Sequence, residues 1–321
     1  IQVSEDAVVT NNGVINVDIT TPTLKPQDFM VLGSPMSSGA PQGVDTPIFR
    51  MFNHNTLAFR PHPAIQALYA DGTNFIDEDS NDYTVYNSDF VPGTGYYVKP
   101  QASPTDGNQQ YNLRYSEGTL NSGMVSYDLE YNTTGTGTGT ASDNKNASPN
   151  VLSNPYASGI SANDFMVAND AVDELYFWEH NTATTATFPG SDITNYNMAD
   201  ISIFNAIGFN PASTGSGASF QGTISSSQGF GIKNNGATTG TGQRVVFTNS
   251  MRTQINTTLR TPQGTQRILL FLKNNEYELQ STTLIGFTNN ATQEFDPGYD
   301  SKRVGVPVSI YSHLPDGSES L

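Results

Sequence analysis

The stretch GTGYYVK at residues 93–99 returns in the second half of the chain as SQGFGIK at residues 227–233. Both stretches pass through glycine into aromatic and aliphatic side chains and end in lysine. This pattern predicts a β-strand in each place. Glycine at the start of such a strand indicates a bulge or the close approach of another backbone.

Two further pairs of stretches match in the same order along the chain. VLGSPM at 31–36 corresponds to VLSNPY at 151–156, and FRMFNHNT at 49–56 corresponds to LYFWEHNT at 175–182. An apolar pair that runs into proline is typical of a strand that stops, because proline cannot donate to a ladder. Three matches in one order indicate an internal duplication, with the insertions placed in loops.

The duplication and the composition predict an all-β protein with two related halves. Only 14% of the residues are charged, and Asn, Thr, Ser and Gly supply the polarity, which favours strands and turns over helices. We expect tandem β-sandwich domains of jelly-roll or immunoglobulin-like type after a short N-terminal β-rung segment. The expected boundaries are a β-rung or hairpin segment at 1–24, a first sandwich at 25–132, a Thr/Gly-rich linker at 133–150 and a second, longer sandwich at 151–321.

Three stretches outside the repeats carry predictions of their own. Residues 267–272 form a nearly continuous apolar run, which predicts a central strand buried on both faces. Residues 124–131 alternate and predict a half-buried strand. Ser161 stands before Ala162 in an N-cap pattern, which predicts one short helix.

The charge balance and the missing cysteines exclude several kinds of partner. The formal net charge is −16, and such an anionic surface repels nucleic acid and anionic membranes. No apolar run approaches the roughly 20 residues of a membrane span, so we expect no membrane insertion. Without cysteine there is no disulfide, thiolate metal site or cysteine nucleophile.

The repeat blocks follow an order that is found in a known class of proteins. They comprise a Ser-Pro block, a Gly-x-Gly-Tyr-x-Val strand, an Asn-Pro-Tyr block, a Tyr-Phe-Trp-x-His-x-Thr strand and a Phe-x-Asn-Ser-Met-Arg segment. Here these lie at residues 34–36, 93–98, 154–157, 176–182 and 247–252. The chain thereby resembles, over essentially its whole length, the region before the C-terminal sorting domain in proteins that Bacteroidota export through the type IX secretion system. The resemblance implies an extracellular, cell-surface location, contact with the outer-membrane secretion machinery during export, and adhesion or gliding-related roles without catalytic residues.

An acidic stretch is the strongest candidate for a metal site. Asp71, Asp77, Asp79 and Asp82 lie within twelve residues, and Ca²⁺ takes six to eight oxygen ligands from loops of this kind. The stretch lacks the ligand spacing of an EF-hand. The alternative is a solvated acidic loop. Calcium is therefore the only cofactor that the sequence suggests.

Residues that could carry chemistry are few. The alignment of the repeats places His54 and His180 at equivalent positions, which favours a packing or hydrogen-bonding role over zinc or catalysis. Glu174 and Glu179 flank one strand, but strand parity points them to opposite faces. Trp178 is the only tryptophan; its apolar neighbours favour core packing over the stacking of a sugar ring.

The sequence therefore favours a non-catalytic structural or adhesive module of a secreted bacterial cell-surface protein. Its expected partners are other surface proteins or extracellular glycans. The alternative is a carbohydrate-binding module attached to a polysaccharide-degrading enzyme. An enzyme in its own right is the third hypothesis, which no nucleophile elbow, His-Glu-x-x-His or phosphate-binding motif supports.

Overall fold

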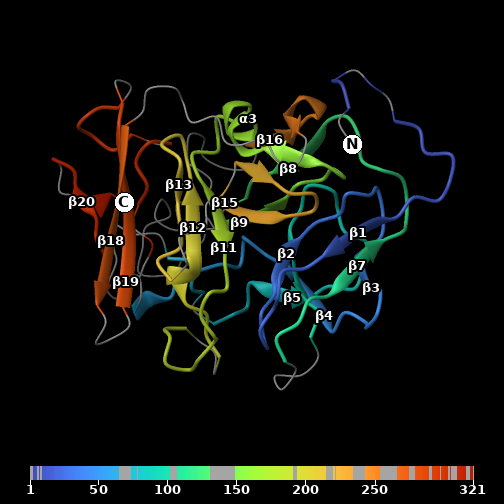
Figure 1. Cartoon of the computed structure of the whole chain (residues 1–321), viewed down its shortest axis with the longest axis horizontal. Coiled ribbons are helices and arrows are strands. Elements are labelled where there is room, and N and C mark those ends of the chain that lie inside the picture. The colour runs from blue at the N-terminus through green and yellow to red at the C-terminus, as the bar shows by residue number, and fades with distance from the viewer. Residues whose placement is uncertain are drawn as a thin grey trace.

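The computed structural model is built almost entirely from short antiparallel strands (Figure 1). The predicted all-β, sandwich-type fold is confirmed. Among the described residues, no helix has the length and apolarity that a bilayer crossing requires. The structure describes residues 3–5, 7, 9–64, 74–77, 79–101, 107–130, 149–190, 194–214, 220, 222–233, 243–253, 266–274, 279–288, 291–296, 298–302, 304, 309–315 and 319–320.

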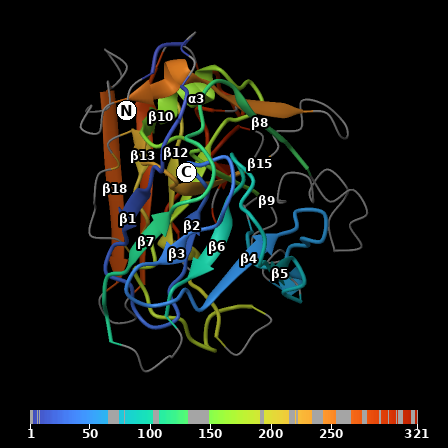
Figure 2. The same cartoon turned by 90° about the vertical axis from the view of Figure 1, so that its right-hand side faces the viewer.

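The first half consists of two sheets that share one core. One sheet has the order β2-β6-β4-β5, with bounds Met30–Leu32, Tyr96–Lys99, Arg50–His54 and Tyr83–Val85. The other has the order β1-β7-β3, with bounds Val17–Thr20, Asn112–Tyr115 and Gln42–Gly43. Figure 2 looks onto this half. Leu32, Tyr96 and Val98 enter the core from the first sheet, and Leu113 enters it from the second.

The second half repeats this plan with more strands. Its main sheet has the order β13-β12-β11-β15-β9, with bounds Phe209–Asn210, Ile201–Phe204, Leu175–Trp178, Gly229–Lys233 and Pro149–Ser153. Smaller sheets pair β16 with β8 (Arg244–Phe247, Val125–Asp128) and order β14-β10-β17 (Thr223–Ile224, Gly159–Ser161, Arg252–Thr253). Phe230 and Phe247 pack in the core between them.

The predicted short helix is present as α3, Ala162–Val167. The Ser161 hydroxyl accepts a hydrogen bond from the Asp164 amide at 3.1 Å, which satisfies one of the free N–H groups at the helix start. Phe165 is fully buried and stacks on Phe247. The cap and this one aromatic side chain thus fix the helix over the core.

The internal duplication is visible in the strand order. The strands β2, β6 and β4 come from the three first-half stretches, and β9, β15 and β11 come from their counterparts. Both sets are ordered with the glycine-led strand in the middle. The register agrees as well, because Val31 pairs with Tyr97 and its counterpart Val151 pairs with Gly231.

The two halves bond to each other reciprocally along a line that we call the seam. The Gly33 amide donates to the Ser227 carbonyl at 2.9 Å, and the Ser153 amide donates to the Gly93 carbonyl at 2.9 Å. Since Gly33 corresponds to Ser153 and Gly93 to Ser227, these are the same contact made twice. Such reciprocity is the mark of a two-fold relation.

Glycine is required at the seam because the backbones approach closely. A Cβ atom at Gly95 would lie 2.6 Å from the Leu152 carbonyl oxygen, and one at Gly229 would lie 2.8 Å from the Val31 carbonyl carbon. The same Cβ atoms would lie 2.8 Å from Cγ1 of Val151 and 2.2 Å from Cγ1 of Val31. These are again equivalent contacts. The close backbone approach that the sequence indicated is therefore confirmed, and the backbone approached belongs to the other half.

The long apolar run at 267–272 is not a buried central strand, and that prediction is wrong. It lies in β18 (Gln266–Asn274), which pairs with β19 (Leu279–Phe287) in a two-stranded sheet. Phe271 is 62% exposed and Ile268 is 47% exposed. Figure 1 shows this hairpin at the far left of the molecule. A lone two-stranded sheet cannot cover both faces of its own strands.

The expected domain boundaries stay a prediction, and two strand pairings lie across them. Strand β1 pairs with β7, so residues 17–20 of the expected N-terminal segment are part of a first-half sheet. Strand β8 pairs with β16 of the second half. Residues 133–148 of the expected linker lie outside the described residues, and Pro149 already begins β9. A last pair, β20 and β21 (Ser312–His313, Glu319–Ser320), closes the chain.

Candidate functional site

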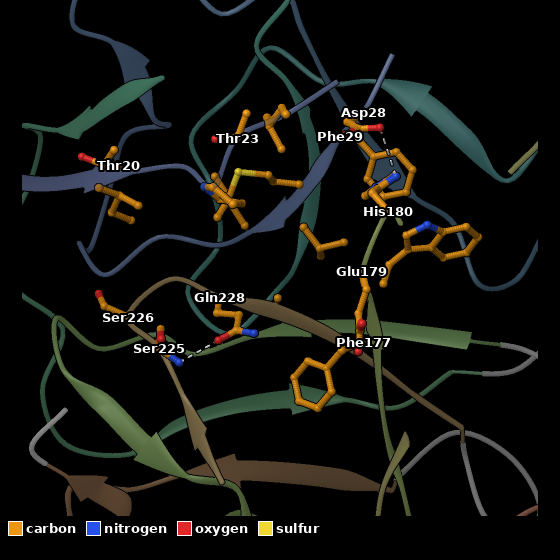
Figure 3. Close-up of a pocket in the computed structure, with 18 residues that line it drawn as sticks. Thr20, Thr23, Asp28, Phe29, Phe177, Glu179, His180, Ser225, Ser226 and Gln228 are labelled. Atoms are coloured by element: carbon orange, nitrogen blue, oxygen red, sulfur yellow. Dashed lines mark hydrogen bonds and ion pairs between the residues drawn. The ribbon is translucent and has the colours of Figure 1, made fainter. Parts of the chain in front are cut away.

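A cavity of about 380 Å³ lies between the two halves; we call it the seam cavity. One wall comes from β1, β2 and the segment between them, and the other comes from β11 and the turn before β15. Figure 3 shows Thr20 and Thr23 on one side, and Ser226 and Gln228 below them. The cavity therefore exists only because the halves meet.

Asp28 and His180 form the polar corner of the seam cavity. Oδ1 of Asp28 lies 3.7 Å from Nδ1 of His180, and the two side chains are 4% and 9% exposed (Figure 3). Oδ2 of Asp28 accepts a hydrogen bond from the Lys25 amide at 2.8 Å. The Gln101 side chain donates to the carbonyls of Lys25 and Asp28, which holds this turn in place.

The backbone around this corner is strained. The φ angles are +48° at His180, +72° at Gln27 and +62° at Ser227. Residues other than glycine rarely adopt this left-handed backbone conformation. The Lys25 ammonium donates to the His180 carbonyl, and the Tyr196 hydroxyl donates to the Gln27 carbonyl at 3.0 Å. Contacts between the halves thus stabilise the unusual conformations.

Burial sets the protonation of the corner. It lowers the pKa of His180 to about 3, with the Lys25 charge as a second cause, so the imidazole is neutral at pH 7. Burial raises the pKa of Asp28, and the Asp200 charge adds to this, while the Lys25 amide opposes it. A hydrogen bond with the Phe29 backbone opposes the lowering of the His180 pKa.

Trp178 belongs to an aromatic cluster beside the cavity. Its ring centroid lies 5.6 Å from that of Tyr196 and 5.8 Å from those of Phe29 and His180. Phe29 also meets Tyr196 edge to face at 5.0 Å. These are the preferred geometries of packed aromatic side chains, so the indole is engaged in packing between the halves.

The two repeat histidines are not structurally equivalent, which corrects the sequence alignment. Phe52 pairs with Tyr97, whereas Tyr176 pairs with the corresponding Gly231. Tyr176 thus takes the place of Phe52, and His180 lies two residues beyond the position of His54. A slip of two residues keeps every side chain on its face, so an alternating pattern does not reveal it.

His54 forms a buried cluster with Asp82 and Thr56. Its Nε2 lies 3.1 Å from Oδ2 of Asp82, and its Nδ1 lies 3.4 Å from the Thr56 hydroxyl. The group has the composition of a hydroxyl nucleophile, base and acid. Thr56 is only 2% exposed, however, and its hydroxyl donates to the Pro149 carbonyl at 2.7 Å. The cluster therefore joins β4 to the start of β9.

The acidic stretch is used largely by the protein itself. The Asp77 carboxylate accepts from the backbone amides of Arg60, at 2.8 Å, and Asn81, at 3.2 Å. Asp79 accepts from the Asn81 side chain, and Asp82 faces His54. Asp71 lies outside the described residues.

Calcium binding by Asp71, Asp77, Asp79 and Asp82 stays a prediction. In the part of the chain that the structure describes, no three His, Asp or Glu side chains gather closely enough to hold a metal ion.

Glu174 and Glu179 are separated, as strand parity predicted. Glu174 is buried beside the Tyr176 hydroxyl, and its Oε2 lies 3.6 Å from Nζ of Lys233. Burial lowers the pKa of Lys233. Glu179 instead lines the seam cavity with Asp28. Of these residues lining the seam cavity, the sequence analysis singled out His180 and Glu179 as candidates. It did not single out Asp28 or Gln228, because both are distant from them in sequence.

Comparison with known proteins gives one match. A family model described as a domain of unknown function (DUF8693) matches residues 1–319. No curated protein and no solved structure matches the chain.

Proposed function

The chain belongs to the DUF8693 family, and we propose that it is a non-catalytic adhesive or structural module of a secreted bacterial cell-surface protein. It acts by presenting an extended β-surface to neighbouring surface proteins. The observation that carries this proposal is the exposed apolar hairpin of β18 and β19.

The hairpin has the features of a contact surface. Its exposed side chains are large and apolar on consecutive positions, so both faces of β18 reach solvent: Ile268, Leu269, Phe271, Leu272, Ile285 and Phe287. Apolar surface of this kind marks sites of protein association. Each strand has nine residues, and β18 has no second strand partner among the described residues. A long, flat, apolar edge strand is a template for pairing with another chain.

The polar clusters support a role without chemistry. The Thr56 hydroxyl is bonded to a carbonyl, and Glu174 is engaged by Tyr176 and Lys233. The seam also supports a structural role, because reciprocal backbone hydrogen bonds join the two halves. The cell-surface location rests on the sequence resemblance.

A photo-crosslinking experiment on intact cells tests the proposal. A photoreactive phenylalanine analogue replaces Phe271 in one variant and Phe287 in another, which are 62% and 53% exposed. The matched control carries the analogue at Val167, which is 74% exposed on α3. We expect adducts with a neighbouring surface protein from the hairpin positions and none from the control. Recovery of the protein only as a soluble, uncrosslinked monomer would refute the proposal.

A further inference from the structure

The seam cavity has the size and place of a ligand site. Its volume of about 380 Å³ is within the range of about 300–1,000 Å³ that is typical of small-molecule pockets. Such pockets occur preferentially where two domains meet. The cavity opens between β2 of the first half and β11 of the second (Figure 3). A molecule bound there touches both halves at once.

The charge of the walls excludes one class of ligand. Asp28 and Glu179 line the cavity, and no lysine or arginine is among the described residues that line it. The Lys25 ammonium at this corner is engaged by the His180 carbonyl, so a phosphate, sulfate or carboxylate would face two acidic side chains on the walls. The walls therefore disfavour an anionic ligand.

The polar groups of the walls suit a ligand that both donates and accepts hydrogen bonds. The carboxylate of Glu179 accepts, and the side chain of Gln228 donates through Nε2 because its Oε1 accepts from the Ser225 amide at 2.9 Å. The Ser226 hydroxyl is buried without a hydrogen-bond partner in the described part of the chain, and the imidazole of His180 faces the Asp28 carboxylate at 3.7 Å and the Phe29 backbone. Buried polar groups of this kind are normally hydrogen-bonded, so a hydroxyl-rich ligand fits them.

Apolar side chains supply the rest of the lining. Phe177 lies at the lower side of the cavity in Figure 3, and Leu24, Met30 and Val31 line it from the first half. A sugar ring presents C–H groups on its faces and hydroxyls around its edge. From this combination we propose that the seam cavity binds a neutral sugar residue, with its hydroxyls on Glu179, Gln228, Ser226 and His180. The site does not depend on the hairpin surface, so either proposal can fail without the other.

The test is titration of the full chain with a panel of sugars, followed by NMR or calorimetry. The panel contains methyl glycosides of glucose, galactose, mannose and N-acetylglucosamine, with glucuronate as the charged comparison. We expect saturable binding of at least one neutral glycoside, with a Kd on the order of 1 mM for a ligand of this size. Glucuronate is expected to bind at least tenfold more weakly, because the two carboxylates repel it.

Three variants place the bound sugar in the cavity. Glu179→Gln replaces one acceptor oxygen with a donor, and Gln228→Ala removes the Nε2 donor; we expect each to weaken binding about fivefold or more. Ser225→Trp fills the opening from an exposed position and should abolish binding. Glu117→Gln and Gln42→Ala are the matched controls, since both are exposed and distant from the cavity lining, and should bind like the parent.

The outcomes decide the proposal. Binding that Ser225→Trp abolishes, that Glu179→Gln and Gln228→Ala weaken, and that both controls keep supports it. No saturable binding of any neutral sugar, a preference for glucuronate, or binding that survives Ser225→Trp overturns it. Circular dichroism of each variant shows whether a loss of binding reflects a loss of fold, and Ser225→Trp, being exposed, remains informative if another variant is unstable.

Discussion

A double-mutant cycle across the seam tests the reciprocal contact. A Cβ atom at Gly33 would lie 1.6 Å from Oγ of Ser153 and 2.8 Å from the Thr94 carbonyl oxygen. The Gly33→Ala variant therefore forces the Ser153 hydroxyl away from Thr94, to which it donates at 2.8 Å. The lost hydrogen bond costs about 1 kcal/mol and the overpacking about 1–3 kcal/mol. We expect a total of about 2–4 kcal/mol.

The partner variant and the double variant complete the cycle. Ser153→Gly loses the same hydrogen bond and gains backbone freedom, at about 2 kcal/mol. In the double variant the Oγ clash is gone and the hydrogen bond is lost only once. The double variant should therefore lose at least about 1 kcal/mol less stability than the sum of the losses in the two single variants.

Urea unfolding, monitored by far-UV circular dichroism, measures the four free energies of unfolding. Gly13→Ala is the control, because a Cβ there meets nothing within 4 Å, and it should leave stability unchanged within about 0.5 kcal/mol. Additive costs for the pair, within about 0.5 kcal/mol, would refute the reasoning that Gly33 and Ser153 compete for one space.

Three more predictions concern pH, a buried amide and calcium. Folding lowers the pKa of His180 from about 6.5 to about 3, so its contribution to stability is complete above pH 6.5 and is lost as the pH falls toward 3. The loss should reach about 3 kcal/mol at pH 4.5. In urea unfolding at several pH values, His180→Asn should flatten this dependence, and parallel curves for the two proteins would contradict the prediction. The raised pKa of Asp28 acts with the opposite sign and offsets part of the loss. Asn154→Ala removes donors to three carbonyls and the acceptor for the Tyr156 amide, and it should cost about 2–4 kcal/mol in urea unfolding, where a cost under 1 kcal/mol would count against it. Calcium bound at residues 71–82 should raise the melting temperature and a chelator should reverse the rise, whereas a melting temperature indifferent to both removes this site.

The sequence was sufficient for the strands but not for their partners. Alternation and repeated blocks predicted β2, β6, β9 and β15 because strand formation depends on local side-chain pattern. The glycine signal at Gly95 and Gly229 was also local, since a missing Cβ means that something comes near. The local pattern does not indicate which backbone approaches each glycine, because that depends on how the two halves pack against each other.

Long-range pairing explains what the sequence missed. The run at 267–272 is apolar enough for a core, yet exposure depends on whether other strands cover it, and β18 has only β19 beside it in the described chain. The seam cavity was missed because Asp28 and Gln228 are 200 residues apart in sequence and meet only when the halves associate. His180 was noticed through its repeat position, although the structure places it two residues away from that of His54.

The reciprocal seam also limits how the fold can grow. A head-to-tail contact between repeats leaves one complementary face open at each end, so that further repeats can be added without limit. At the seam each half already uses the contact in both directions, through Gly33 with Ser227 and Ser153 with Gly93. The two halves therefore form a closed pair, like the two subunits of a two-fold dimer, and this contact leaves no equivalent face open for a third repeat. Any longer array must be joined through a different face, and the uncovered β18 edge is such a face.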